Sequence, residues 1–260
     1  DVSVLIQGLV ERGIVREVGS RENMVVSPIF LVPKGSGGHR FILNLKRLNL
    51  ELPTEKFKME SLSMALDLMV PNCWLAKVDL KDAYYSIPMA DDSKHLLGFH
   101  WKGNLYQFNR MPNGLNQAPR QFTKLLKPAV GHLRAQGQIL CVYLDDFLLV
   151  APVSREEAVQ QLLLLKQLLK SLGFTINEEK SSQEPSHCVE FLGFVLNSEH
   201  MTIMLPVSKR LLLRERVSRL LDERETSLRD LASLIGSLQA ADPAIRVARL
   251  HYRSLQQLKI

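Results

Sequence analysis

The segment QILCVYLDDFLLVAP, residues 138–152, carries two adjacent aspartates, Asp145 and Asp146, between two apolar runs. Short apolar runs rich in β-branched and aromatic residues are typical of buried strands, so the segment predicts a tight hairpin with the aspartates between its strands. Successive side chains of a strand point to opposite faces, whereas a tight turn can present both carboxylates, one inward and one toward the turn. The apolar flanks indicate that this tip is embedded in a core.

Carboxylates in an apolar setting need a partner, because burying an unpaired charge costs roughly several kcal/mol unless a cation meets it. Aspartate is also a common turn residue, so the pair alone favours an ordinary turn. A third carboxylate changes that interpretation, since Asp79 ends another apolar strand within CWLAKVDL, residues 73–80. Three carboxylates without His or Cys suit Mg²⁺, which completes its shell with water and phosphate oxygens. Two such ions about 4 Å apart activate a 3′-hydroxyl and stabilise a leaving pyrophosphate, which is nucleotidyl transfer.

The composition is that of an ordinary globular protein. The chain has 260 residues, 46% apolar and 23% charged, which suits one large domain or two to three subdomains that share a core. It has no apolar run of the roughly 18 residues that a membrane helix needs. The N-terminus lacks the features of a secretory signal, and its missing Met suggests a fragment or a processed chain. Three widely spaced cysteines disfavour a disulfide framework or a zinc site and favour an intracellular location.

The charge is unevenly distributed. The formal net charge is +6, which permits a polyanionic partner without requiring one. Residues 207–260 hold 11 Lys or Arg against 6 Asp or Glu. A basic surplus on helices is compatible with phosphate binding and equally with a solvated face.

Hydrophobic periodicity and turn residues predict mixed α and β structure that ends in helices. A helix and a turn are expected within residues 3–18, and a helix over 59–70. Hairpins are expected at 28–45, with a glycine-rich tip, and around 102–104. Asn116 is expected to cap a helix that ends near residue 136, and Ser154 one over 154–172. Strand-like segments follow at 174–176, 189–196 and 202–205, and helices at 207–224, 227–240 and 243–258, the last starting at Pro243.

Four motifs occur in the order VDLKDAYYSIP (78–88), MPNGLNQAPRQFTKLL (111–126), YLDD (143–146) and VEFLGF (189–194). Together they resemble the successive motifs of reverse transcriptases, and the similarity runs from about Leu9 to about Leu258. Residues 59–89 and 118–137 most resemble DIRS-like retrotransposons, whose elements encode a tyrosine recombinase, and gypsy-like elements come next.

The resemblance implies an α+β right-hand polymerase fold, with fingers, a palm whose antiparallel sheet is backed by helices, and a helical thumb. The expected division is fingers 1–53, palm 54–86, fingers 87–117, palm 118–200 and thumb 201–260. It implies Asp79 and Asp145 as the main metal ligands, assisted by the Leu80 carbonyl, with Asp146 as a supporting carboxylate. Two Mg²⁺ ions are expected, for which Mn²⁺ can substitute.

Further positions match the nucleotide site of this family. Tyr84 matches the aromatic residue that excludes a 2′-hydroxyl, and a core tyrosine is the alternative. Arg40 has the charge and fork geometry to contact the triphosphate. The full set expected around the nucleotide is Lys34, Arg40, Asp82, Ala83, Tyr84, Asn113 and Gly114. Lys180 lies where a motif lysine protonates pyrophosphate, and a solvated lysine is the alternative.

Two positions depart from the family. The fingers tip at Lys34 is shorter than in many retroviral enzymes, and Asn113 stands where gypsy-like elements have Phe and retroviruses Gln. The residues expected to contact template or primer are Pro119, Phe122, Tyr143, Leu192 and Gly193, the last two as the primer grip. The basic helices after residue 206 resemble a thumb that holds phosphates without reading sequence.

The resemblance implies an RNA-directed DNA polymerase that extends a primer on RNA or DNA. Its expected partners are an RNA template, a DNA primer or template and deoxynucleoside triphosphates, with no membrane. Two alternatives stay open: a catalytically silent, domesticated nucleic-acid-binding module, and an RNA-directed RNA polymerase. The three carboxylates argue against the first alternative, and Tyr84 argues against the second.

Overall fold

The central element is the hairpin that the YLDD segment predicts. The computed structural model describes residues 2–19, 23–33, 37–53, 55–222, 225–245 and 247–257. In it β7 (Ile139–Tyr143) pairs antiparallel with β8 (Asp146–Ala151), and β8 pairs antiparallel with β4 (Trp74–Asp79), in the order β4-β8-β7. The expectation that both aspartates lie between the strands is wrong. Asp146 already pairs with Tyr143, so the turn consists of Leu144, at φ +55°, and Asp145.

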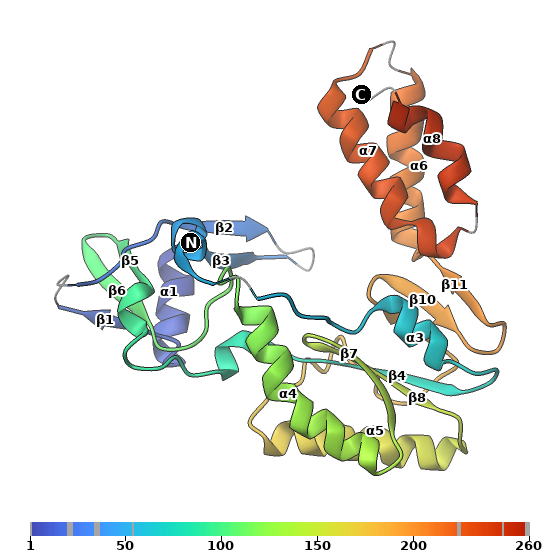
Figure 1. The fold of residues 1–260 in the computed structure, drawn as a ribbon, viewed down its shortest axis with the longest axis horizontal. Coiled ribbons are helices and arrows are strands. Elements are labelled where there is room, and N and C mark those ends of the chain that lie inside the picture. The colour runs from blue at the N-terminus through green and yellow to red at the C-terminus, as the bar shows by residue number, and fades with distance from the viewer. Residues whose placement is uncertain are drawn as a thin grey trace.

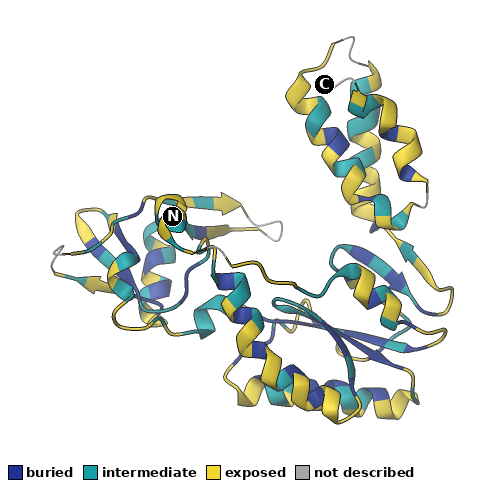
Figure 2. Cartoon of the chain, in the orientation of Figure 1, coloured by how far each residue is buried: buried dark blue, intermediate teal, exposed yellow. Residues whose placement is uncertain are grey.

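Both faces of this sheet are covered (Figure 1). Helices α4 (Ala118–Ala135) and α5 (Arg155–Ser171) lie on one face, and α3 (Leu62–Leu68) lies on the other. The strands are therefore buried from both sides (Figure 2), which explains why they read as nearly continuous apolar runs.

The side chains of β4 alternate between two cores. Ala76 and Val78 belong to the core with α4 and α5, and Leu75 belongs to the core with α3. Because side-chain direction repeats every second residue, Lys77 and Asp79 leave the sheet on the same face as Leu75.

A second sheet packs on the α3 side, in the order β11-β10-β9. The segment 189–196, expected as one strand, is a hairpin of β9 (Cys188–Phe191) and β10 (Phe194–Asn197), because Leu192 and Gly193 adopt positive φ and reverse the chain. Strand β11 (Thr202–Met204) lies at the predicted place. The strand expected at 174–176 is reduced to one bridge, between Ile176 and Leu80.

The N-terminal part has its own core, built from aromatic and aliphatic residues of four strands and a helix. The hairpin expected at 28–45 is confirmed in its two strands, whereas Lys34 lies outside the described residues. Strand β1 was not predicted, because its alternation of apolar and charged residues is only four residues long. The elements are α1 (Val2–Glu11), β1 (Val15–Val18), β2 (Ile29–Pro33), β3 (His39–Leu43), α2 (Lys46–Glu51), η1 (Ala83–Ser86), η2 (Lys94–Leu96), β5 (Gly98–Trp101) and β6 (Asn104–Phe108).

Two predicted helix starts are wrong. The N-cap of α4 is Gln117, because the side chain of Asn116 is used elsewhere and donates to the Asn49 carbonyl at 3.2 Å. Pro243 lies in a short 3₁₀ turn, η3 (Asp242–Ala244), and α8 (Ala248–Gln257) begins after it. The predicted cap Ser154 is confirmed, since its Oγ accepts from the Glu157 N–H at 3.2 Å.

The C-terminal helices form a bundle that extends away from both sheets (Figure 1). Helices α6 (Val207–Asp222) and α7 (Leu228–Ala240) complete it together with α8. The described part of α6 has no fully buried residue, so this bundle has a thin core. Among the described residues, no helix combines the length and apolar character that crossing a bilayer requires.

The free edge of β7 is satisfied by two side chains. The Val142 N–H donates to Glu60 Oε2 at 2.6 Å, and Arg134 Nη2 donates to the Leu140 carbonyl at 2.8 Å. Arg134 Nη2 also lies 2.6 Å from Glu60 Oε1, so one ion pair covers a donor and an acceptor of the edge strand. The strand that leads into the Leu144–Asp145 turn is therefore fixed from its outer side.

We predict that Glu60→Ala lowers the free energy of unfolding by about 1–3 kcal/mol, because it leaves a half-buried N–H without its charged acceptor. Urea unfolding monitored by circular dichroism measures the change. Glu215→Ala is the matched control, since Glu215 forms an exposed pair with Arg219 on α6 and should change stability by only about 0.5 kcal/mol. Equal losses in the two variants would contradict the edge-strand role of Glu60.

Candidate active site

The three carboxylates meet where β7 turns into β8. Asp79 is the direct cross-strand partner of Asp146 in the β4–β8 ladder, and Asp145 occupies the adjoining turn. The Leu80 N–H donates to the Asp145 carbonyl at 2.9 Å, which ties the turn to the end of β4. The arrangement follows from the register, because a shift of one residue would send Asp79 and Asp146 to opposite faces.

A cavity of about 860 Å³ opens beside these carboxylates. Its walls come from α1, from β3, from the segment after β4 and from residues 175–180. The residues predicted for the site that line it are Arg40, Asp79, Leu80, Asp82, Ala83, Tyr84, Asn113, Asp145 and Lys180. The structure thus brings together residues from five separate sequence segments.

Burial and repulsion from neighbouring carboxylates raise the pKa values of Asp79 and Asp145. Burial raises the pKa of Asp79, the charge of Asp146 raises it further, and Lys77, Lys180 and a hydrogen bond from Asn177 oppose the rise. Burial also raises the pKa of Asp145, and repulsion from Asp146 and Asp79 raises it further. A hydrogen bond from its own backbone N–H and the charge of Lys77 lower it. Such a site favours a cation, because a cation offsets both effects.

Lys77 supplies one cation, and the sequence interpretation missed it. Its Nζ lies 2.8 Å from Asp146 Oδ1 and 3.9 Å from Asp79 Oδ2. The signal was present in the sequence: residues two apart on a strand share a face, which places a lysine next to the carboxylate.

The segment after α5 holds the outer edge of β4, and this supporting role was not predicted. Ser181 Oγ accepts from the Asp79 N–H at 3.0 Å, and Ser182 Oγ accepts from the Lys77 N–H at 2.9 Å. The Asn177 N–H donates to the Asp79 carbonyl at 2.8 Å. Serine hydroxyls in an irregular segment give no periodic signal, so nothing in the sequence indicated this support.

The donor set fits a hard divalent ion in its chemistry. In the described part of the chain, no three His, Cys, Asp or Glu residues are grouped closely enough to form a metal cluster. The three carboxylates are nevertheless adjacent, and Asp79 and Asp145 line the cavity and have raised pKa values that a dication would reverse. Oxygen donors without thiolate or imidazole suit Mg²⁺ or Mn²⁺.

The loop after β4 lines the cavity from Leu80 to Tyr85. Asp82 adopts a left-handed conformation at φ +52° and pairs with Arg12 of the N-terminal segment at 2.8 Å, a partner that sequence reasoning did not identify. Tyr84 packs edge-on against the buried Phe122 with ring centroids 5.5 Å apart. Burial raises the pKa of Tyr84 to about 12, helped by the charge of Asp145, so its hydroxyl stays protonated.

Asn113 also lines the cavity, whereas the next residue, Gly114, which was expected at the nucleotide, does not. Asn113 Nδ2 donates to the Tyr85 hydroxyl at 3.2 Å, so its amide already has a partner. Gly114 has φ +105°, and a Cβ there would lie 2.8 Å from the Leu43 carbonyl oxygen. Only glycine fits this close backbone contact.

The residues predicted to contact template or primer lie outside the cavity lining. Pro119 is in the first turn of α4, Tyr143 ends β7 opposite Asp146, and Leu192 and Gly193 form the β9–β10 turn. Lys209 of α6 donates to the Gly193 carbonyl at 3.0 Å, which links that turn to the helical bundle.

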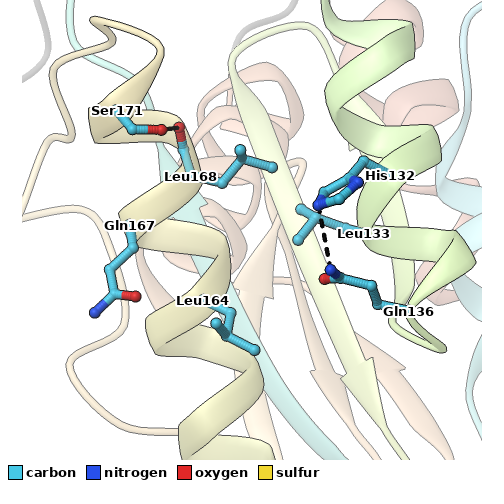
Figure 3. A pocket seen from close by; sticks show the side chains of 7 residues that line it. All are labelled: His132, Leu133, Gln136, Leu164, Gln167, Leu168 and Ser171. Carbon is cyan, nitrogen blue, oxygen red and sulfur yellow. Dashed lines mark hydrogen bonds between the residues drawn. The ribbon is translucent and has the colours of Figure 1, made fainter.

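A second hollow, of about 260 Å³, lies between α4 and α5 (Figure 3). Its lining has no carboxylate, and His132 is its one ionisable side chain. It shares no residue with the larger cavity, so the carboxylate cavity is the candidate active site.

Comparison with known proteins bears on the family and the fold of the chain. Residues 32–196 match the family model for reverse transcriptase (RNA-dependent DNA polymerase). The chain is 28% identical over 233 residues to the Gag-Pol polyprotein of Rous sarcoma virus subgroup C (strain Prague), covering 85% of this chain and 13% of the polyprotein. It is 27% identical over 196 residues to the transposon Tf2-3 polyprotein of Schizosaccharomyces pombe, covering 75% of this chain and 14% of that one. The chain therefore spans about a seventh of these relatives.

Among solved structures, the chain resembles the foamy viral protease-reverse transcriptase dRH in complex with double-stranded DNA. The TM-score is 0.82 at 21% identity, covering 99% of this chain and 42% of that one. This likeness confirms the predicted fold class, an α+β right-hand polymerase fold.

We predict that Asp145→Asn stabilises the metal-free protein near neutral pH. The folded-state pKa of Asp145 lies above its ordinary value, so between the two values the folded chain binds more protons, and stability falls as pH rises through that window. The uncharged amide avoids this loss. In EDTA the variant should melt about 2–5 °C above the parent near pH 7, and the difference should shrink toward zero near pH 4. A variant that is less stable near pH 7 would refute the electrostatic account.

Proposed function

The chain belongs to the reverse transcriptase (RNA-dependent DNA polymerase) family, and we propose that it extends a primer on an RNA or DNA template by two-metal nucleotidyl transfer. One observation carries the proposal: Asp79 and Asp146 stand in register across the β4–β8 ladder, with Asp145 in the adjoining turn, beside a cavity of about 860 Å³. A protein that only bound nucleic acid would gain nothing from carboxylates whose burial and mutual repulsion cost stability.

Asp79 and Asp145 would hold two Mg²⁺ ions, for which Mn²⁺ can substitute, with the Leu80 carbonyl assisting and Asp146 as electrostatic support. The ions would supply the activation of the 3′-hydroxyl and the neutralisation of the leaving pyrophosphate. The protein's own contribution is positioning, because phosphoryl transfer needs little covalent help.

The incoming nucleotide would lie in the cavity. The Arg40 guanidinium and the backbone N–H groups of Asp82 and Ala83 would meet the triphosphate. The Tyr84 ring, held by Phe122, would press on the sugar at C2′. The remaining contacts that we propose are Lys34, Asn113 and Gly114, with Lys180 as a general acid toward pyrophosphate.

Template and primer would run over Pro119, Phe122 and Tyr143 and past the primer grip at Leu192 and Gly193. The basic surplus of residues 207–260 supports a thumb that holds phosphates. Structures of foamy viral protease-reverse transcriptase contain double-stranded DNA or an RNA/DNA hybrid, which supports the same class of partner here.

We propose the subdomain boundaries that the sequence predicts: fingers 1–53 and 87–117, palm 54–86 and 118–200, and thumb 201–260. The separate N-terminal core supports this division, because that core draws its buried residues from the two fingers segments. Among retroelements, the DIRS-like group remains the nearest resemblance that we propose, ahead of gypsy-like elements. Three free cysteines, two of them buried, support an intracellular location.

We predict that Asp79→Asn and Asp145→Asn each lower primer extension on an RNA template by about 10²–10³-fold or more, because each removes a negatively charged metal ligand. Extension is measured with labelled primer and Mg²⁺, then repeated with Mn²⁺. Glu156→Gln, an exposed carboxylate on α5, is the control and should extend normally. A parent chain that binds primer–template but does not extend it would favour the silent binding module.

We predict that Tyr84→Val raises the use of ribonucleotides relative to deoxynucleotides by at least about tenfold, because a smaller side chain leaves room for a 2′-hydroxyl. Single-nucleotide incorporation with dNTP and rNTP gives the ratio. Tyr84→Phe keeps the ring and should keep the discrimination. Efficient ribonucleotide use by the parent would contradict the proposal that Tyr84 excludes a 2′-hydroxyl, and it would favour an RNA polymerase.

A further inference from the structure

Lys77 lies inside the proposed metal site without being a possible ligand. Its ammonium is 2.8 Å from Asp146 Oδ1 and 3.9 Å from Asp79 Oδ2. The three side chains are 18%, 22% and 11% exposed, so water screens the pair only partly. A half-buried lysine that contacts two of the three essential carboxylates must affect how they meet a metal ion.

The backbone fixes Lys77 in this position. Lys77 and Asp79 share a face of β4, and Asp146 lies opposite Asp79 on β8. The Lys77 N–H donates to Ser182 Oγ, and its carbonyl accepts from the Ser182 N–H at 2.8 Å, so Ser182 holds the outer edge of β4 while β8 pairs with the other edge. The ammonium therefore reaches Asp146 from a rigid strand and not from a mobile loop.

The contacts divide the three carboxylates unequally. Asp146 forms the short ion pair with Lys77, Asp79 is at the limit of the same interaction, and no ion pair of Asp145 occurs among the described residues. Asp145 and Asp79 both line the cavity, whereas Asp146 does not. Lys77 thus forms its short ion pair with the carboxylate that does not line the cavity, and the two carboxylates that do line it are left with at most a weak ion pair.

We infer that Lys77 is a positioning residue, which holds Asp146 in an ion pair away from the metal ions and so weakens and directs metal binding. The inference rests on the proposed function, since it concerns the same metal site. Without the lysine, the Asp146 carboxylate would have no ion-pair partner there, and the net charge of the site would be more negative by one. The site would then bind a dication more tightly, and Asp146 could join its coordination.

Mn²⁺ binding to the full chain without nucleic acid tests the inference, with free Mn²⁺ measured by electron paramagnetic resonance. We expect Lys77→Gln to bind Mn²⁺ about tenfold more tightly than the parent. Lys77→Arg keeps the charge and should bind like the parent. The double variant Lys77→Gln with Asp146→Asn should return to near-parent affinity, because the freed carboxylate is then absent.

The melting temperature in EDTA gives a second measurement that needs no metal. We expect Lys77→Gln to melt several degrees lower, by about 3–6 °C, and the double variant to recover most of the loss. A lower melting temperature with unchanged or weaker Mn²⁺ binding would make Lys77 merely structural and overturn the inference.

The two proposals fail differently. A parent chain that extends primers, but whose Mn²⁺ affinity does not respond to Lys77→Gln, overturns the inference alone. A chain that shows the tighter Mn²⁺ binding and the rescue by Asp146→Asn, but extends no primer, overturns the proposed function alone.

Discussion

The structure depends on the register between β4 and β8, which sets Asp79 opposite Asp146. Hydrophobic residues on both sides of these strands fix that register, because a slip of one residue would exchange two buried faces. The energy of burying apolar side chains therefore holds charged groups close together against their repulsion. The site is electrostatically unfavourable in the free protein, and the core stabilises the fold sufficiently to maintain it.

Residues around the carboxylates reduce the unfavourable electrostatic energy of the site but do not remove it. Lys77 compensates Asp146, serine hydroxyls hold the backbone of β4, and Glu60 with Arg134 holds the outer edge of β7. Each support acts on a strand and not on a loop, which gives the carboxylates fixed positions. Fixed positions matter here because two-metal chemistry gains its rate from placement, and a displacement of about 1 Å is already expensive.

The sequence predicted the parts of the fold that follow from local patterns. Apolar runs and turn residues located the β7–β8 hairpin and α5, and the motif at 78–88 located seven consecutive residues of the cavity lining, from Asp79 to Tyr85. What it missed depends on contacts between distant segments. Arg12 meets Asp82 from 70 residues away, and Ser181 meets Asp79 from 102 residues away. No periodicity encodes such pairs. Asn116 was expected as a cap because of its residue type, yet a competing partner, Asn49, uses its side chain.

Residues of the strands at the proposed active site are deeply buried, whereas those of the C-terminal helices are more exposed. The central strands are enclosed on both faces, whereas α6 buries none of its described residues fully (Figure 2). A polymerase must keep its metal ligands still while a duplex of varying sequence slides past. A thinly packed, basic bundle suits the second task, because phosphate contacts demand charge and not an exact surface. One direct contact joins the two regions at the proposed primer grip, because Lys209 at the start of α6 donates to the Gly193 carbonyl of the β9–β10 turn.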